Sequence, residues 1–243
     1  MKTEVIFPVY NEADTLSNQI KKFNDYFDIN YRKNLIITIA DNGSTDLTPK
    51  ICENLLKNKL IDNYLFISEK GRGRAIKQSI VSSKADIVSY MDIDLSTDLS
   101  HFKPLVDSIA SERNDISIGS RLSKKSKVIG RKKIREFTSR AYNLLIKFYF
   151  PKSKIDDMQC GFKAFSREKI LKILNLVENN RWFFDTELIL LARKYNLKID
   201  QIPVKWTDDP NTSVNIISTA IEDIVGLTKL RLKLFKKNYT END

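Results

Sequence analysis

Two aspartates, Asp92 and Asp94, follow an apolar run that contains Ile87 and Val88 and are separated by one residue. On an ideal strand they would point to the same face, where two carboxylates repel each other unless a cation lies between them. Such hard oxygen ligands suit Mg²⁺ or Mn²⁺, above all when a phosphate group is nearby. We therefore expect Asp92 and Asp94 to hold a divalent metal ion.

Two more acidic segments resemble the one at residues 92–98: PVYNEAD at residues 8–14 and DNGSTD at residues 41–46. A single segment of this kind is more typical of a turn or a helix cap than of a binding site. All three follow predicted strands, and their repetition at one sheet edge favours a binding site. Asp41 and Asn42 could accept hydrogen bonds from a base or ribose, and Gly43 would let the backbone come close. This pattern suggests a nucleotide site.

The segment EKGRGRA, residues 69–75, combines two glycines with three cations. A dinucleotide-binding fingerprint would need a third glycine where Ile76 stands, and the Walker lysine motif is absent. The segment therefore indicates neither a Rossmann cofactor site nor a P-loop. The alternative to a ligand-binding role is a basic surface loop that caps a helix.

The elements that must position these residues alternate along the chain. Runs rich in β-branched residues occupy residues 4–9, 35–40, 64–68, 86–92 and 115–119, with helical patterns near residues 13–27, 48–59, 74–83 and 100–111 between them. This alternation predicts an α/β fold with a Rossmann-like, mostly parallel sheet flanked by helices. Such sheets bind ligands outside the carboxyl ends of their strands, where all of these motifs fall.

The composition narrows the choice of partners. The 243 residues carry a net charge of +10, which should attract an anionic partner. The two cysteines, Cys52 and Cys160, are too far apart in sequence to indicate a zinc site, and they favour a reducing, cytoplasmic setting. We expect neither a signal peptide nor a membrane-spanning helix, because the apolar runs are short.

Eight segments, in this order, resemble the family 2 glycosyltransferases, which have a GT-A fold: FPVYNEADTL, ADNGSTDLT, EKGRGRAI, MDIDLST, GSRL, MQCGFKAFSR, WFFDTELILLA and IPVKW. The resemblance covers residues 3–207 and is strongest to the dolichyl- or polyprenyl-phosphate β-glucosyltransferases, with the dolichyl-phosphate mannose synthases as neighbours. No Pro/Gly/Ser-rich linker or internal repeat interrupts the chain, so we expect a single domain over residues 1–243. Within it we expect a nucleotide-sugar-binding half (1–120), an acceptor half (121–207) and an amphipathic helical tail (208–243).

The resemblance also implies roles for individual residues. The residues expected to bind the nucleotide-sugar are Pro8, Tyr10, Glu12, Asp41, Lys70, Gly71, Asp92 and Ile93. The metal ligands are Asp92 and Asp94, and the catalytic residues are Asp94, Arg121 and Asp185. The residues expected to bind the acceptor are Arg131, Gln159, Cys160, Gly161 and Glu187. One departure from the family pattern is Ser213, which stands directly before Val214 where related enzymes often have a lysine.

The implied reaction is an inverting, metal-dependent transfer of glucose from UDP-glucose to dolichyl or polyprenyl phosphate at the cytosolic membrane face. Two alternatives remain open at this stage: GDP-mannose as donor, and a sugar hydroxyl as acceptor. A phosphate is already a nucleophile at neutral pH, so Asp185 would then mainly organise the site. A hydroxyl acceptor would need Asp185 as its general base.

Two basic amphipathic segments, residues 131–150 and 219–237, could lie on an acidic membrane surface. They would make the protein a peripheral membrane protein. The alternative is that both are ordinary amphipathic helices packed on the sheet.

Two other classes of protein deserve comparison. Haloacid-type phosphotransferases also use an Asp-x-Asp motif, but theirs ends the first strand, whereas here it ends the fourth predicted strand. A nucleic-acid-binding module would suit the net charge, but no nucleic-acid motif is present, and we expect no nucleic-acid partner. A catalytically silent relative is disfavoured because Asp41, Asp92, Asp94 and Asp185 are all present.

Overall fold

The computed structural model describes residues 1–208 and 216–240. Its centre is a seven-stranded sheet in the order β3-β2-β1-β4-β7-β5-β8, in which only β7 runs antiparallel to its neighbours. The strands of this sheet are β1 (Thr3–Val9), β2 (Leu35–Asp41), β3 (Asn63–Phe66), β4 (Ile87–Met91), β5 (Ile116–Ser120), β7 (Phe162–Ser166) and β8 (Ile199–Pro203). A small parallel pair, β6 (Lys127–Ile129) and β9 (Lys205–Thr207), lies beside it.

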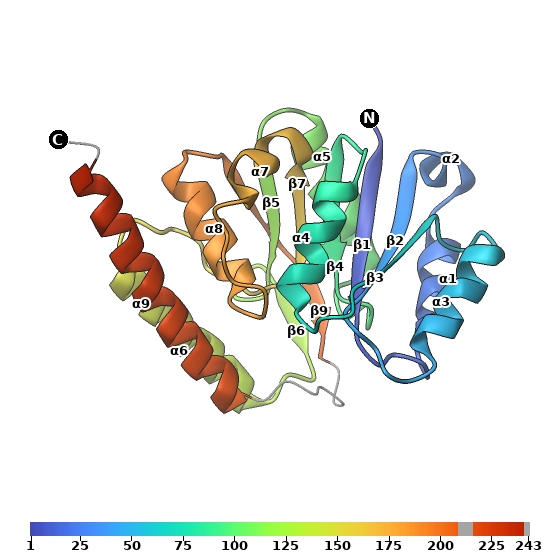
Figure 1. The fold of residues 1–243 in the computed structure, drawn as a ribbon, viewed down its shortest axis with the longest axis horizontal. Helices are drawn as coiled ribbons and strands as arrows, with labels where there is room; N and C mark the ends of the chain where they lie inside the picture. The colour runs from blue at the N-terminus through green and yellow to red at the C-terminus, as the bar shows by residue number, and fades with distance from the viewer. Residues whose placement is uncertain (209–215, 241–243) are drawn as a thin grey trace.

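Helices cover both faces of the sheet (Figure 1). One face carries α4 (Arg72–Ser82), α7 (Arg167–Leu174) and α8 (Phe184–Lys194). The other carries α1 (Leu16–Tyr26), α3 (Thr48–Lys57) and α5 (Phe102–Ala110). The remaining helical elements are α2 (Ile29–Arg32), the 3₁₀ turn η1 (Leu99–His101), α6 (Lys133–Tyr149) and α9 (Ile216–Thr240).

The core follows the two-residue period of the strands. In β1, Val5 and Phe7 join the cluster beneath α1, α3 and α5, whereas Ile6 joins the cluster beneath α4, α7 and α8. Because central strands are covered on both faces, their side chains are apolar at successive positions. This explains why the strands read as continuous apolar runs in the sequence.

The predicted alternation of strands and helices is confirmed over the first 120 residues. One expectation was wrong: the strand predicted to run through Asp92 ends one residue earlier, and neither Asp92 nor Asp94 belongs to it. Strand β4 ends at Met91, and Leu95 takes a positive φ of 52°. The aspartates therefore lie in a turn, and the alternation of a strand cannot decide which way they point.

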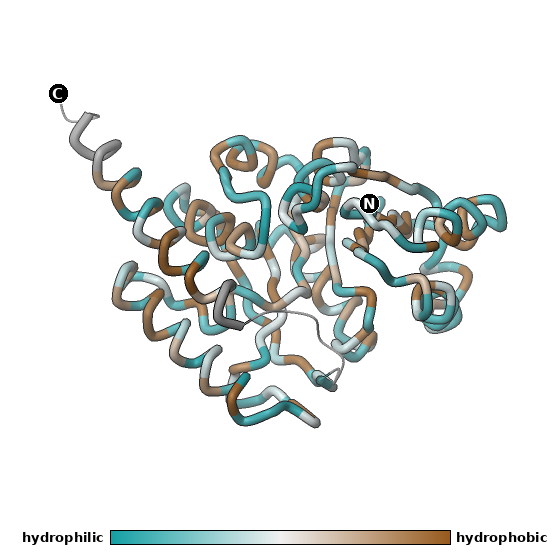
Figure 2. The backbone as a smooth tube through the Cα atoms, turned by 60° about the horizontal axis from the view of Figure 1, so that its bottom comes forward, coloured by the Kyte–Doolittle hydropathy of each residue, from teal (hydrophilic) through white to brown (hydrophobic). Residues whose placement is uncertain are grey.

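Helices α6 and α9 lie side by side at one end of the molecule (Figure 1), where the Tyr149 and Thr228 hydroxyls are 3.0 Å apart. Hydrophobic and hydrophilic residues alternate along α6 and along the coloured part of α9 (Figure 2). The described helices include none that is long and apolar enough to cross a bilayer. The unusual Ser213–Val214 pair lies outside the described residues.

Candidate active site

The three acidic segments meet because β2, β1 and β4 are adjacent and parallel. Residues 10–14, 41–46 and 92–98 follow or close these strands at their carboxyl ends. The amide of Asn42 donates to the Val9 carbonyl at 2.8 Å, and the amide of Asn11 donates to Ser44 Oγ at 2.9 Å. The predicted clustering of acidic segments at one sheet edge is therefore confirmed.

Asp41 is fully buried and holds the turn that follows β2. Its Oδ1 accepts the Ser44 amide at 2.8 Å, and its Oδ2 accepts the Tyr64 hydroxyl at 3.1 Å. Gly43 has a φ of +75°, and a Cβ there would lie 3.0 Å from the Ser68 carbonyl oxygen. The turn thus needs glycine for both its conformation and its close backbone approach.

The basic loop at residues 69–71 folds over this turn. The Gly71 amide donates to Asn42 Oδ1, and Lys70 Nζ lies 3.6 Å from the centroid of the Tyr10 ring. A Cβ on Gly71 would meet the Asn180 carbonyl oxygen at 2.5 Å. Tyr10, Lys70 and Gly71, predicted from separate motifs, therefore lie close to one another and to the turn held by buried Asp41.

Pro8 lies near the carboxyl end of β1, and Glu12 follows this strand. Pro8 lies in β1 opposite Ala40. The Glu12 amide donates to Thr48 Oγ1 at 2.8 Å, and its carboxylate accepts the Thr15 hydroxyl at 2.8 Å. The first turns of the chain after β1 are thus fastened to the start of α3.

Asp92 lies directly against Gly161. A Cβ on Gly161 would be 1.9 Å from Asp92 Oδ2, so only glycine leaves room for that carboxylate. The Asp92 amide also donates to the Gly161 carbonyl at 3.2 Å. On its other side Asp92 Oδ1 accepts Arg72 Nη2 at 2.8 Å. The predicted metal ligand and the predicted acceptor loop are therefore in contact.

Asp94 lies in the turn after β4, half-buried, and its Oδ1 accepts the Ser96 amide at 2.9 Å. Ile93, between the aspartates, is only 4% exposed and packs in the core beneath α1, α3 and α5. A nucleotide-sugar contact by Ile93 would thus have to come from its backbone.

Asp185, at the start of α8, is buried within a network of donors. Arg72 Nη1 donates to its Oδ2 at 2.5 Å, and both Lys163 Nζ and the Tyr90 hydroxyl donate to its Oδ1. Burial alone would raise the pKa of Asp185, but Lys163 and Arg72 together hold it below its usual value. Asp185 is therefore a carboxylate with its oxygens already engaged, an arrangement suited to organising charge rather than accepting a proton.

Arg72 connects the two predicted carboxylates, because it binds Asp92 and Asp185 at once. Its guanidinium also lies 5.4 Å from the Trp182 ring and 5.6 Å from the Tyr90 ring. Gly73 lets α4 approach α8 closely, since a Cβ there would meet Phe184 Cβ at 2.4 Å. The tight packing of these helices keeps Arg72 between the two acids.

A group of cations lies in the half of the chain that is predicted to bind the acceptor. Arg121 forms a two-point ion pair with buried Asp157 and lies 5.1 Å from the Trp206 ring. Arg131 donates to Ser139 Oγ at 2.6 Å. Burial, followed by the neighbouring Arg121 guanidinium, lowers the pKa of Arg131. The structure thus brings the two predicted arginines together.

The other predicted acceptor residues differ in their surroundings. Gln159 Nε2 donates to Asp223 Oδ2 of α9 at 2.8 Å. The Cys160 side chain is fully buried, and burial raises the pKa of its thiol to about 12. Glu187 Oε2 accepts the amides of Glu178 and Asn179 at 3.1 and 2.8 Å. Cys160 and Glu187 therefore serve the loops around the site, and direct acceptor contacts by them stay a prediction.

Four charged residues of this region were not singled out from the sequence: Arg72, Asp157, Lys163 and Asp223. Lys163 interrupts the apolar strand β7 and is 0% exposed, and a lysine inside such a run signals a buried ion pair. Asp223 shares a helix face with Leu227 and Leu230, at spacings of four and seven residues, which marks it as inward-facing. Arg72 lies in the quoted segment EKGRGRAI, and Asp157 directly precedes the quoted segment MQCGFKAFSR, but neither carries a distinct signal.

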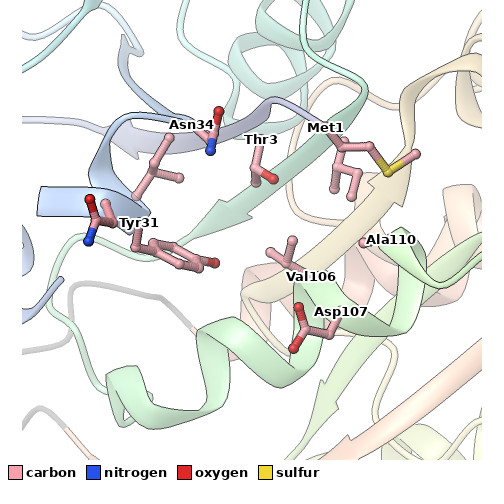
Figure 3. Close-up of a pocket in the computed structure, with 10 residues that line it drawn as sticks. Met1, Thr3, Tyr31, Asn34, Val106, Asp107 and Ala110 are labelled. Atoms are coloured by element: carbon pink, nitrogen blue, oxygen red, sulfur yellow. The ribbon is translucent and has the colours of Figure 1, made fainter. Parts of the chain in front are cut away.

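A cleft of about 380 Å³ lies at the opposite end of the sheet (Figure 3). Met1, Thr3, Tyr31, Val106 and Asp107 are among the residues that line it. It adjoins the amino ends of β1, β2 and β4 and contains none of the predicted site residues. The acidic segments therefore lie away from this cleft.

The donor set at the carboxyl ends fits a hard divalent cation. Asp92 and Asp94 provide carboxylate oxygens, and the Asp92 side chain is 36% exposed despite its contact with Arg72. Among the described residues no group of three or more acidic, histidine or cysteine side chains could enclose a metal. Two carboxylates that leave room for phosphate oxygens are typical of Mg²⁺ sites.

Comparison with known proteins identifies the family of this chain. The family model Glycosyl transferase family 2 matches residues 4–174. Glycosyltransferase AglD of Haloferax volcanii is 32% identical over 93% of this chain, which spans 36% of that protein. Dolichyl-phosphate beta-glucosyltransferase of Saccharomyces cerevisiae is 27% identical over 98% of this chain and 76% of its own length.

The fold has a counterpart among solved structures. Glucosyl-3-phosphoglycerate synthase of Mycobacterium tuberculosis, crystallised with Mn²⁺, UDP-glucose and phosphoglyceric acid, superposes with a TM-score of 0.71 at 18% identity. The match covers 95% of this chain and 79% of that one and identifies the fold as GT-A. With the family model matching residues 4–174, these findings show that the chain belongs to glycosyltransferase family 2.

Proposed function

We propose that this glycosyltransferase moves glucose from UDP-glucose to dolichyl or polyprenyl phosphate, with inversion at the anomeric carbon. The observation that carries the proposal is the contact between the acidic strand ends and the acceptor loop, where Asp92 lies against Gly161 and Arg121 lies close by. The names of the curated relatives, dolichyl-phosphate beta-glucosyltransferases, supply the donor sugar and the acceptor class.

On the donor side, Tyr10, Asp41, Lys70 and Gly71 would hold the nucleoside. Lys70 Nζ lies 3.6 Å from the centroid of the Tyr10 ring, and because a cation–π contact is weak, it would turn toward an anionic group. Asp92 and Asp94 would hold Mg²⁺ or Mn²⁺. When bound, this ion neutralises the negative charge that develops on the departing diphosphate.

On the acceptor side, a phosphate monoester carries close to two negative charges at neutral pH. Arg121 and Arg131 are the cations we assign to it, and the Asp157 carboxylate fixes the direction of Arg121. The attacking oxygen forms its bond to the sugar C1 as the bond from C1 to the diphosphate oxygen breaks. No proton has to be removed, which agrees with an Asp185 carboxylate already engaged by Lys163, Tyr90 and Arg72.

The test is transfer of label from UDP-glucose or GDP-mannose to a polyprenyl phosphate with Mg²⁺ or Mn²⁺, and with EDTA in a parallel reaction. We expect lipid-linked product from UDP-glucose that EDTA abolishes. Product from GDP-mannose alone would contradict the donor. Nucleotide binding without any transfer would contradict the phosphate acceptor and direct attention to sugar hydroxyls.

We further propose that α6 and α9 form the surface that meets the membrane at its cytosolic face. Exposed apolar side chains gather on these helices: Ile134, Phe137, Leu144 and Phe148 on α6, and Ile221, Ile224, Val225, Leu232 and Phe235 on α9. Lysines and arginines on the same helices, such as Arg140, Lys147 and Lys229, would favour an anionic leaflet. This surface would bring the site to an acceptor that resides in the bilayer.

A further inference from the structure

Asp223 connects the C-terminal helix to the acceptor loop. It is 3% exposed, and its Oδ2 accepts Gln159 Nε2 at 2.8 Å. Leu227 and Leu230, on the same face of α9, are 0% and 3% exposed, so this face is firmly packed on the domain. A buried carboxylate on an otherwise apolar helix face is costly and needs a specific reason.

The 157–161 loop that Asp223 reaches carries two other contacts of the site. Asp157, two residues before Gln159, binds Arg121, and Gly161, two residues after it, lies against Asp92. Fixing the Gln159 side chain therefore restrains the backbone between these two contacts. We propose that Asp223 is a positioning residue that, through Gln159, holds the 157–161 loop in the shape required to receive the acceptor. This inference rests on the proposed function.

The surroundings of the second Asp223 carboxylate oxygen affect the pKa of this residue. Oδ1 is buried and finds no hydrogen-bond partner among the described residues. Four groups face the carboxyl: Gln159 from the loop, Tyr142 from α6, Asp185 from α8 and Glu222 from its own helix. Burial, reinforced by the negative charges of Glu222 and Asp185, raises the pKa of Asp223 to about 7.

The sign of the resulting pH dependence follows from linkage. The docked Asp223 binds its proton more tightly than an exposed aspartate, whose pKa is near 3.8. The docked state is therefore favoured at low pH and loses this advantage as the pH rises through about 7. Docking here means the packing of the Asp223 carboxyl against Gln159 of the 157–161 loop. From pH 6 to pH 8 the equilibrium constant for this docking should fall about tenfold, and above pH 8 it should level off.

The experiment is amide hydrogen exchange of the full chain between pH 5.5 and 8.5, corrected for intrinsic exchange rates. In the wild type, protection of the 157–161 loop should fall about tenfold from pH 6 to pH 8. Asp223→Asn keeps an acceptor oxygen for Gln159 but cannot titrate, so its loop protection should be independent of pH. Asp223→Ala and Gln159→Leu should both loosen the loop about tenfold or more, as expected when one buried hydrogen bond is lost.

Thr228→Val is the matched control. It removes the contact between Thr228 and Tyr149 of α6, yet it leaves Asp223 and Gln159 in place. We expect normal loop protection in this variant. If Thr228→Val loosens the loop equally, Asp223 contributes only to the general packing of α9. If the pH dependence persists in Asp223→Asn, another group is responsible for the titration. Either result would overturn the inference.

Steady-state kinetics separate this inference from the proposed function. With a polyprenyl phosphate acceptor, Asp223→Ala should raise the acceptor KM about tenfold and leave the UDP-glucose KM unchanged. Equal changes in both KM values would contradict a specific effect on the acceptor loop. Absence of transfer by the wild type would contradict the proposed function alone, because the exchange measurements decide the coupling without any turnover.

Discussion

Arg121 and Asp157 form a two-point ion pair, with Nε and Nη2 each 2.8 Å from a different carboxylate oxygen. The Asp157 carboxylate also accepts the Arg121 backbone amide at 2.9 Å. Its side chain is 2% exposed, and that of Arg121 is 12% exposed. Three hydrogen bonds to one buried carboxylate fix both the backbone and the side chain of Arg121, which leaves this cation little freedom to turn away from the site.

We expect Asp157→Ala to lower the free energy of unfolding by about 3–5 kcal/mol, because it leaves the Arg121 charge buried without a partner. Urea unfolding measures the change. Arg140→Gln, which removes an exposed i,i+4 pair with Glu136, should cost less than about 1 kcal/mol. Equal losses of unfolding free energy in the two variants would show that the buried pair stabilises the fold no more than the exposed pair does.

The same pair predicts a dependence of stability on pH. Burial alone would raise the pKa of Asp157, but Arg121 holds it below the usual 3.8. The stability contributed by the pair is therefore complete above the unfolded-state pKa and is lost as the pH falls through the lowered folded-state pKa. We expect the wild type to lose stability more steeply than Asp157→Asn as the pH falls below about 4. Parallel curves in acid-unfolding titrations would contradict this assignment.

The pH profile of the reaction should report the acceptor rather than Asp185. Because the pKa of Asp185 is held low, its carboxylate is charged throughout the neutral range and should add no acid limb there. A phosphate acceptor loses its second proton near pH ~6, so kcat/KM should fall below that pH. A phosphonate analogue with a higher second pKa should move the limb upward. If the acid limb lies at the same pH with both acceptors, the group that titrates belongs to the enzyme.

Gly161→Ala should weaken metal binding without unfolding the protein. The added Cβ would lie 1.9 Å from Asp92 Oδ2, so that carboxylate must move. We expect the affinity for Mn²⁺ to fall at least about tenfold, which titration followed by electron paramagnetic resonance measures. Gly130→Ala is the control, because the nearest atom to its new Cβ, the Asp208 carbonyl oxygen, is 3.9 Å away. It should cost about 1 kcal/mol of stability through its positive φ and leave Mn²⁺ affinity unchanged. Unchanged affinity in Gly161→Ala would contradict Asp92 as a ligand.

The sequence predicts the fold well because its strongest signals are local. Apolar β-branched runs identify the central strands, and the rule that ligands bind at the carboxyl ends of parallel strands places Asp41, Asp92 and Lys70 at one edge. The turn after Met91 could not be predicted in this way, because the residue at which a strand ends depends on hydrogen bonds to other strands. Lys163 alone signals a buried ion pair, but its partners could not be predicted, because Asp185 and Arg72 lie on α8 and α4, far from β7 in sequence.

The proposed membrane surface predicts the effect of removing two aromatic side chains. Phe137 and Phe148 of α6 are 69% and 80% exposed, so Phe137→Ser with Phe148→Ser should leave folding intact. The double variant should bind vesicles that contain anionic lipid about tenfold less tightly, because it loses apolar surface that the bilayer would cover. Flotation with such vesicles at low salt measures this, and added salt should weaken binding by the wild type.

The matched control for this surface is Phe66→Ser in β3, which is 49% exposed and belongs to the edge strand opposite β8. Helices α6 and α9 lie beyond α8 at the other end of the molecule (Figure 1). The Phe66→Ser variant should float like the wild type, because β3 is at the opposite end of the sheet from the two helices. If the wild type fails to bind at low salt, where attraction to the vesicle is strongest, the surface does not meet a membrane. If Phe66→Ser reduces binding as much as the α6 variant does, the interaction depends on general apolar exposure and α6 has no special part in it.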